Sequence, residues 1–151
     1  MLNKDFKEFV GLLNSTNVEY LLVGGYALAA YGHPRYTGDI DFWINPTPEN
    51  ADLLLSVLAQ FGFGGLGLTA DDFRKPDAVV QLGYPPARID LLTAIDGVLF
   101  ADCYPRRQSF IVDGVTLQLI DVDDLKANKR AAARPKDLAD LDALDEAGTL
   151  D

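Results

Sequence analysis

Hydrophobic residues recur along the chain with spacings typical of helices and strands. In residues 5–13 the apolar side chains at positions 6, 9, 10 and 13 share one face, which predicts an amphipathic helix. Residues 18–23 form a short apolar run that ends at Gly24-Gly25, and the helix-prone, alanine-rich residues 26–31 follow. This order predicts a strand, a tight turn and a second helix.

The remaining segments show the same two periodicities. Further strands are expected over residues 39–44, 78–82, 88–93, 108–112 and 116–120, the last four arranged as two hairpins. Further helices are expected over residues 48–61, from the N-cap Asp121, and after Pro135. These elements predict an α+β fold, a small mixed β-sheet flanked by helices, with C-terminal helices. We expect a single domain over residues 1–151, with a core of about residues 1–120 and a C-terminal helical part of about residues 121–151.

Composition narrows the possible functions. The 13 Lys and Arg against 23 Asp and Glu give a formal charge of −10, which disfavours sequence-independent DNA binding but leaves room for a local basic patch. One cysteine and one histidine exclude an internal disulfide and a Cys/His zinc site. The best apolar run, residues 21–31, is too short and too broken by glycine to span a membrane, and no secretory signal is recognised. We therefore expect a cytoplasmic protein without a membrane partner.

Three aspartates are the main candidates for chemistry. Asp39 and Asp41 lie two residues apart in a predicted strand and point to the same face, and Asp90 interrupts another apolar strand. If the two strands are neighbours, the three carboxylates converge and could hold one or two Mg²⁺ ions. The alternative is a solvated edge strand carrying Asp39 and Asp41, with Asp90 paired to Arg88 or another base.

Other residues are candidates for phosphate contacts. The turn at Gly24-Gly25 exposes backbone amides that suit an anionic phosphate, although tight geometry alone also explains two glycines. Arg35 could reach a triphosphate or neutralise the nearby aspartates. Residues 126–136 carry five basic residues, of which Lys129 is favoured for a phosphate contact, ahead of Lys136 and Asp137. The alternative for this segment is a solvated helix face paired with Asp123, Asp124 and Asp137.

Trp43 shares the face of the first two aspartates but lies at the far end of their strand. Core packing against a helix is favoured over stacking on a nucleobase.

Several motifs together resemble a known family. The string Leu22-Val23-Gly24-Gly25, thirteen further residues, Asp39-Ile40-Asp41-Phe42 and the later Asp90 resemble the signature of the DNA polymerase beta-like nucleotidyltransferase superfamily. Additional segments resemble small bacterial nucleotidyltransferase-like proteins of the abortive-infection and toxin-antitoxin type: Tyr26-Ala27-Leu28, Tyr31-Gly32, Arg35, Thr37, Asn128-Lys129-Arg130 and Arg134-Pro135-Lys136-Asp137. The resemblance covers most of the chain.

The resemblance implies a reaction and its site. Mg²⁺ would be held by Asp39 and Asp41, with Asp90 as third ligand or as general base toward an acceptor hydroxyl. The enzyme would transfer a nucleoside monophosphate from an NTP, such as ATP, to tRNA, a protein or a small molecule, and would release pyrophosphate. An antitoxin-like protein partner is also implied.

One residue departs from the family pattern, because many members have serine where this chain has Gly25. The departure keeps open a second hypothesis, a catalytically silent domain of the same fold that binds a nucleotide or a protein partner.

Overall fold

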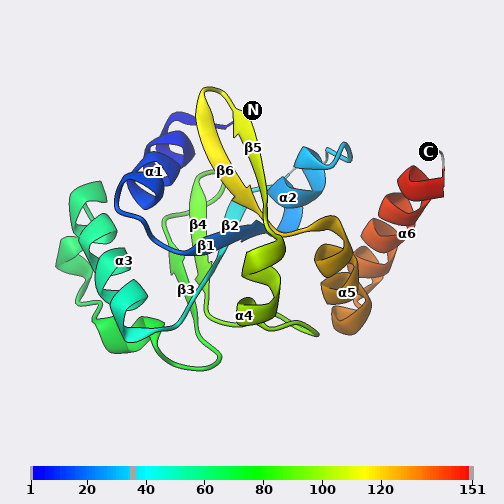
Figure 1. The fold of residues 1–151 in the computed structure, drawn as a ribbon. Coiled ribbons are helices and arrows are strands. Elements are labelled where there is room, and N and C mark those ends of the chain that lie inside the picture. Colours follow the sequence, from blue (N-terminus) through cyan, green and yellow to red (C-terminus); the bar gives the residue numbers. More distant parts are fainter. Residues whose placement is uncertain (1, 35–36, 150–151) are drawn as a thin grey trace.

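The computed structural model describes residues 2–34 and 37–149, which form a mixed β-sheet flanked by helices (Figure 1). The strands are β1 (Tyr20–Val23), β2 (Asp39–Ile44), β3 (Val79–Leu82), β4 (Arg88–Leu92), β5 (Gln108–Val112) and β6 (Val115–Leu119). The α-helices are α1 (Lys4–Ser15), α2 (Gly24–Ala30), α3 (Pro48–Phe61), α4 (Phe100–Cys103), α5 (Val122–Ala132) and α6 (Pro135–Thr149). The α+β prediction is confirmed.

The six strands form one sheet in the order β3-β4-β2-β1-β6-β5. The pairs β3–β4 and β5–β6 are antiparallel hairpins, as predicted, and β1 and β2 are also antiparallel. By contrast, β2 and β4 run parallel, as do β1 and β6. Strand β2 therefore lies in the interior of the sheet, where both of its edges are hydrogen-bonded.

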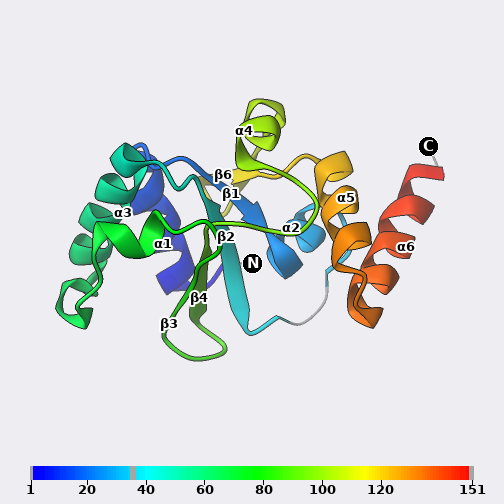
Figure 2. The ribbon, with the colours of Figure 1, turned by 90° about the horizontal axis from the view of Figure 1, so that it is seen from below.

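The amphipathic helices α1 and α3 cover one face of the sheet and pack side by side (Figures 1 and 2). Helix α1 begins after Asn3, whose side chain accepts a hydrogen bond from the backbone amide of Phe6 at 2.8 Å. Phe9 of this helix lies 5.5 Å from the Phe42 ring of β2, measured between ring centroids. Phe42 and its alternate neighbours on β2 therefore face the apolar core, and the intervening residues face the other side.

The opposite face of the sheet carries α4 and, further along, the pair α5 and α6, which pack on each other (Figure 2). Trp43 is buried there, and its ring meets Phe100 of α4 edge to face at 5.2 Å. Core packing of Trp43 is thereby confirmed. In α5 the side chain of Asp121 accepts a hydrogen bond from the backbone amide of Asp123 at 3.1 Å, which confirms the predicted N-cap.

Some short elements were not predicted. Helix α4 and the 3₁₀ turns Gly64–Leu66, Ala70–Phe73 and Tyr104–Arg106 span only three or four residues each, too few to produce a readable hydrophobic period. Within the described residues, no helix is long and apolar enough to cross a bilayer.

Candidate functional site

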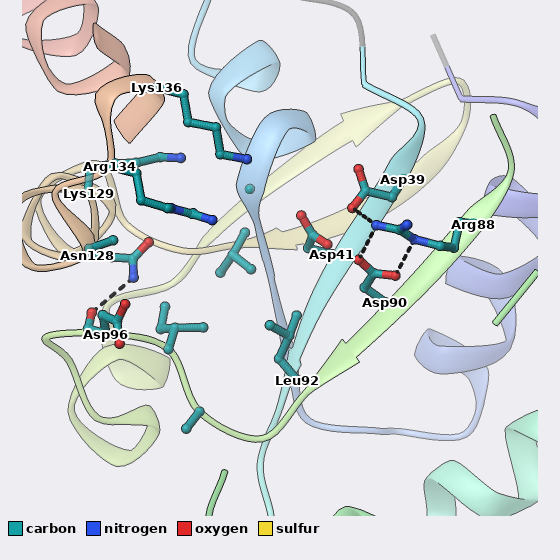
Figure 3. A pocket seen from close by; sticks show the side chains of 15 residues that line it. Asp39, Asp41, Arg88, Asp90, Leu92, Asp96, Asn128, Lys129, Arg134 and Lys136 are labelled. Atoms are coloured by element: carbon teal, nitrogen blue, oxygen red, sulfur yellow. Dashed lines mark hydrogen bonds and ion pairs between the residues drawn. The ribbon is translucent and has the colours of Figure 1, made fainter. Parts of the chain in front are cut away.

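Asp39, Asp41 and Asp90 converge on the face of the sheet opposite α1 and α3 (Figure 3). The parallel register of β2 and β4 places Asp41 beside Asp90, and Asp39 beside Arg88. Each aspartate offers one carboxylate oxygen, and these three oxygens lie within 4.8 Å of one another. The expected convergence of these side chains is therefore present, and it arises because the two strands are neighbours.

Arg88 lies against this carboxylate cluster. Its Nε donates to Asp90 Oδ1 at 2.9 Å, and its Nη2 donates to Asp90 Oδ2 at 3.1 Å and to Asp39 Oδ2 at 3.0 Å. The alternative pairing of Asp90 with Arg88 is thus also present, but the edge-strand alternative is wrong because β2 is an interior strand. No ion pair to Asp41 exists among residues 2–34 and 37–149.

The three carboxylates differ in acidity. Burial, followed by the charges of its two aspartate neighbours, raises the pKa of Asp41 to about 8. Burial also raises the pKa of Asp90, although its hydrogen bond from Arg88 acts in the opposite direction. For Asp39 burial is opposed by a hydrogen bond with Asp90 and by the donors of Thr37 and Arg88, and these interactions lower its pKa. Of the three carboxyl groups, Asp41 is the one without a cationic partner in the described part of the chain, and its raised pKa keeps it protonated at neutral pH.

This donor set fits a magnesium ion. Carboxylate oxygens are the protein ligands that Mg²⁺ prefers, and a divalent cation would favour the ionised form of Asp41, which burial and its acidic neighbours disfavour. Asp39, Asp41 and Asp90 are the residues that could hold it.

The junction of β1 and α2 approaches the cluster closely. The predicted turn at Gly24-Gly25 is the first turn of α2 itself, because the helix begins at Gly24, directly after β1 ends at Val23. Gly24 has a φ of 71°, and a Cβ atom at this position would overlap Oδ2 of Asp41. A Cβ on Gly25 would lie 3.1 Å from Cβ of Thr37, whose hydroxyl donates to the backbone carbonyl and Oδ1 of Asp39 at 2.9 and 3.0 Å. Both glycines thus have a packing reason, and Thr37 occupies the space beside Gly25 where a larger side chain would extend.

The basic segment 126–136 is divided between structural and exposed residues. Lys129 is buried, and its Nζ lies 3.4 Å from Asp137 Oδ1 and 3.1 Å from Asp140 Oδ2. Arg134 also pairs with Asp137, through Nε at 2.6 Å. Of the three acids expected to neutralise this segment, Asp137 does so.

Two further side chains of this region, Asp124 and Lys136, do not pair with oppositely charged residues of the segment. Asp124 pairs instead with Arg106, at 2.8 Å. Lys136 is exposed and forms no ion pair within the part of the chain that the structure describes.

These groups surround a cavity of about 360 Å³ (Figure 3). Its lining includes the carboxylate cluster, Gly24, the β4–α4 loop and part of α5. Three cations from the C-terminal part of the chain also line it: Lys129, Arg134 and Lys136. A neighbouring cavity of about 260 Å³ is lined by Gly24, Gly25, Thr37, Asp39 and the same three cations. Of the residues predicted for phosphate contacts, Gly24, Gly25, Thr37, Lys129 and Lys136 line these cavities. Asp137 lines neither of them, because it is buried against Lys129 and Arg134, and Arg35 falls outside the described residues.

Sequence reasoning missed one end of the larger cavity. Leu92 and Asp96 line it together with Asn128, which belongs to a resembling segment but had no predicted role. The backbone carbonyl of Asp96 accepts a hydrogen bond from Asn128 Nδ2 at 3.0 Å. Asp96 lies in a short Asp-Gly turn that carries no catalytic motif, so only its spatial position distinguishes it from other surface acids.

The mixed sheet, the paired aspartates on β2 with a third on β4, and the glycine turn beside them define a nucleotidyltransferase-like protein. Comparison with protein families agrees: the chain belongs to the family described as nucleotidyl transferase of unknown function (DUF2204), which matches residues 2–149. No curated protein matches the chain.

Proposed function

We propose that this protein is a Mg²⁺-dependent nucleotidyltransferase, which moves a nucleoside monophosphate from an NTP to an acceptor hydroxyl and releases pyrophosphate. The observation that carries the proposal is the convergence of Asp39, Asp41 and Asp90 at one end of a cavity whose other walls carry a glycine turn and cations. Family membership supports the reaction class. Mg²⁺, when bound, supplies positive charge that stabilises the charge developing on the transferred phosphoryl group.

Each residue has an expected role in this reaction. Asp39 and Asp41 hold the metal, and Asp90 is either a third ligand or the base that takes the proton of the acceptor hydroxyl. Burial raises the pKa of Asp90, which makes its carboxylate a stronger base than an exposed aspartate. The acceptor oxygen forms a bond to the α-phosphorus, the bond from that phosphorus to the bridging oxygen breaks, and pyrophosphate leaves.

The leaving pyrophosphate requires positive partners. The backbone at Gly24 and Gly25 and the side chain of Lys136 border the smaller cavity next to Asp39 and Asp41, which makes them the best-placed phosphate contacts. Phosphate contacts by Lys129, Asp137, Thr37 and Arg35 remain predictions. Lys129 already serves two carboxylates of α6, so a contact to phosphate would be shared with them.

The test is pyrophosphate release from each of the four NTPs with Mg²⁺, in the presence of tRNA, protein or aminoglycoside acceptors. Asp41→Asn is expected to lower the rate at least about 100-fold, because it removes a metal ligand. Asp52→Asn is the matched control, since Asp52 is exposed on α3 across the sheet from the cavity. Full metal-dependent activity of Asp41→Asn would disprove the assignment.

A silent nucleotide-binding or partner-binding domain is the second candidate. It is favoured by Arg88, which already neutralises two of the three carboxylates, and by Gly25 in place of serine. Mg²⁺-dependent NTP binding without pyrophosphate release from any acceptor would support this candidate.

A toxin-like role in a two-component system is a separate part of the proposal. Growth arrest on expression should then disappear in Asp39→Ala and be relieved by an antitoxin-like partner. Arrest that persists in this variant would disprove a catalytic toxin.

A further inference from the structure

The end of the larger cavity away from the carboxylate cluster has a different character. Asp96 and Asn128 lie across the cavity from the carboxylate cluster (Figure 3). The lining also includes the apolar side chains of Leu92, Ile95 and Ala132. A cavity that combines apolar lining with a few hydrogen-bonding groups is typical of sites for small-molecule ligands.

Backbone contacts hold this polar edge in place. Ile95 and Val98 form an antiparallel bridge across the Asp96-Gly97 turn. Gly97 has a φ of 82°, and a Cβ there would lie 2.5 Å from Cβ of Ala131 on α5. Together with the hydrogen bond from Asn128 to the Asp96 carbonyl, these contacts dock the turn tightly onto α5. Asp96 therefore has a defined position although its side chain is exposed.

The Asp96 carboxylate is available to a ligand. Within residues 2–34 and 37–149 this carboxylate takes part in no hydrogen bond or ion pair. The pKa of Arg134 is raised mainly by Asp137 and to a smaller extent by the charge of Asp96. An ionised carboxylate only accepts hydrogen bonds, through two oxygens that match two parallel donors. Asn128 uses one amide hydrogen toward Asp96 and keeps a second one for a ligand acceptor.

We propose that Asp96 and Asn128 form a nucleobase subsite that selects guanine, so that GTP is the preferred nucleotide; this rests on the proposed function. Guanine presents two adjacent donors on its Watson–Crick edge, N1–H and the 2-amino group, next to the O6 acceptor. Adenine and cytosine place an acceptor beside their amino group, and uracil places its N–H between two carbonyls. Only guanine, among the four bases, therefore satisfies both carboxylate oxygens of Asp96, and the free hydrogen of Asn128 complements O6.

The experiment measures nucleotide affinity by calorimetry in Mg²⁺, with α,β-methylene analogues of GTP, ATP, CTP and UTP that cannot be turned over. Wild-type protein is expected to bind the GTP analogue at least about tenfold more tightly than the other three, since paired charge-assisted hydrogen bonds are lost with each of them. Inosine 5′-triphosphate, which lacks the 2-amino group, should bind with intermediate affinity.

Asp96→Asn provides a gain-of-binding test. Its amide oxygen still accepts N1–H, but its amide nitrogen donates, so it should favour xanthosine 5′-triphosphate, whose O2 replaces the 2-amino group. We expect about a tenfold loss for GTP and a comparable gain for the xanthosine nucleotide. Asp102→Asn, exposed on α4 and outside the cavity lining, is the matched control and should change neither affinity.

The outcomes separate the two proposals. If Asp41→Asn abolishes binding of every nucleotide but Asp96→Asn leaves all affinity ratios unchanged, the guanine subsite is wrong and the nucleotide site stands. If no NTP binds in Mg²⁺ with either wild-type or control protein, the proposed function itself fails. A reversal from GTP to the xanthosine nucleotide in Asp96→Asn supports both.

Discussion

Among the three aspartates of the cluster, Asp41 is the one without a cationic partner in the part of the chain that the structure describes. Arg88 donates to the carboxylates on either side of it, and burial raises its own pKa to about 8. The side chain also lies where any Cβ on Gly24 would overlap it, so it has little space to turn away from the cluster. Ionising a carboxyl group held in this way is costly for the fold, and such strongly shifted groups are typical of functional sites.

This cost predicts that Asp41→Asn changes the free energy of unfolding in a pH-dependent way, in protein stripped of divalent cations. The folded pKa of about 8 exceeds the ordinary value of about 4, so the folded state keeps a proton that the unfolded state has lost. The free energy of unfolding of the wild type therefore falls as pH rises from about 4 to about 8. An asparagine at position 41 does not ionise and so avoids the cost of a buried charge. At pH 8.5 the variant should therefore be more stable than the wild type by at least about 1 kcal/mol, or about 2–4 °C in Tm.

Thermal unfolding followed by circular dichroism at pH 5 and pH 8.5 checks this expectation. The stability difference should widen toward the higher pH, whereas Asp52→Asn on exposed α3 should show no such trend. An Asp41→Asn protein less stable than the wild type at both pH values would contradict the raised pKa.

At the scale of elements, α5 and α6 are joined by a buried ion pair network. Lys129 of α5 is 5% exposed and contacts Asp137 and Asp140 of α6, which are 1% and 9% exposed. Buried charges of this kind are destabilising once a partner is removed, since the remaining carboxylates have no solvent to replace it. The same network places the C-terminal cations along the wall of the cavity.

Lys129→Met is therefore expected to lower the free energy of unfolding by about 3–5 kcal/mol. Lys126→Met is the control on the same helix, because Lys126 pairs with the more exposed Asp145 and should contribute about 1 kcal/mol or less. Urea denaturation of both variants gives the comparison. Equal losses in the two variants would mean that the buried network does not hold α6 to α5.

At the scale of the whole molecule, the candidate site is assembled from distant parts of the chain. The cavities draw on residues 24–25, 37–41, 88–96 and 128–136, which meet only in the folded state. A ligand of this site therefore binds the native protein and not the unfolded chain, and binding must raise the apparent stability.

Saturation with Mg²⁺ and a non-hydrolysable NTP should stabilise the protein by about 2.7 kcal/mol at a ligand concentration of 100 times Kd. For a domain of this size the shift in Tm is about 5–10 °C. Differential scanning fluorimetry measures it, with Asp39→Asn/Asp41→Asn as the variant that should lose the shift and Asp52→Asn as the control. A shift of equal size in the double variant would place the nucleotide elsewhere.

The pattern of apolar and polar residues predicted most of the helices and strands and part of the candidate site. Period-two alternation placed Asp39 and Asp41 on one face, and it located both hairpins, because strand geometry depends on neighbouring residues. Convergence with Asp90 was conditional on strand order, which no local pattern specifies. The basic segment was recognised as a group, but its division into buried Lys129 and exposed Lys136 was not.

Sequence by itself determined the fold class, through the order and periodicity of its elements, and the shared face of Asp39 and Asp41, because strand alternation depends only on adjacent residues. Tertiary structure alone decided that Arg88 bridges Asp39 and Asp90, that Lys129 holds α6, and that Asp96 meets Asn128 at the end of the cavity. These contacts join residues brought together by sheet order and helix docking, and the free energy that selects such an arrangement comes from burial across the whole core.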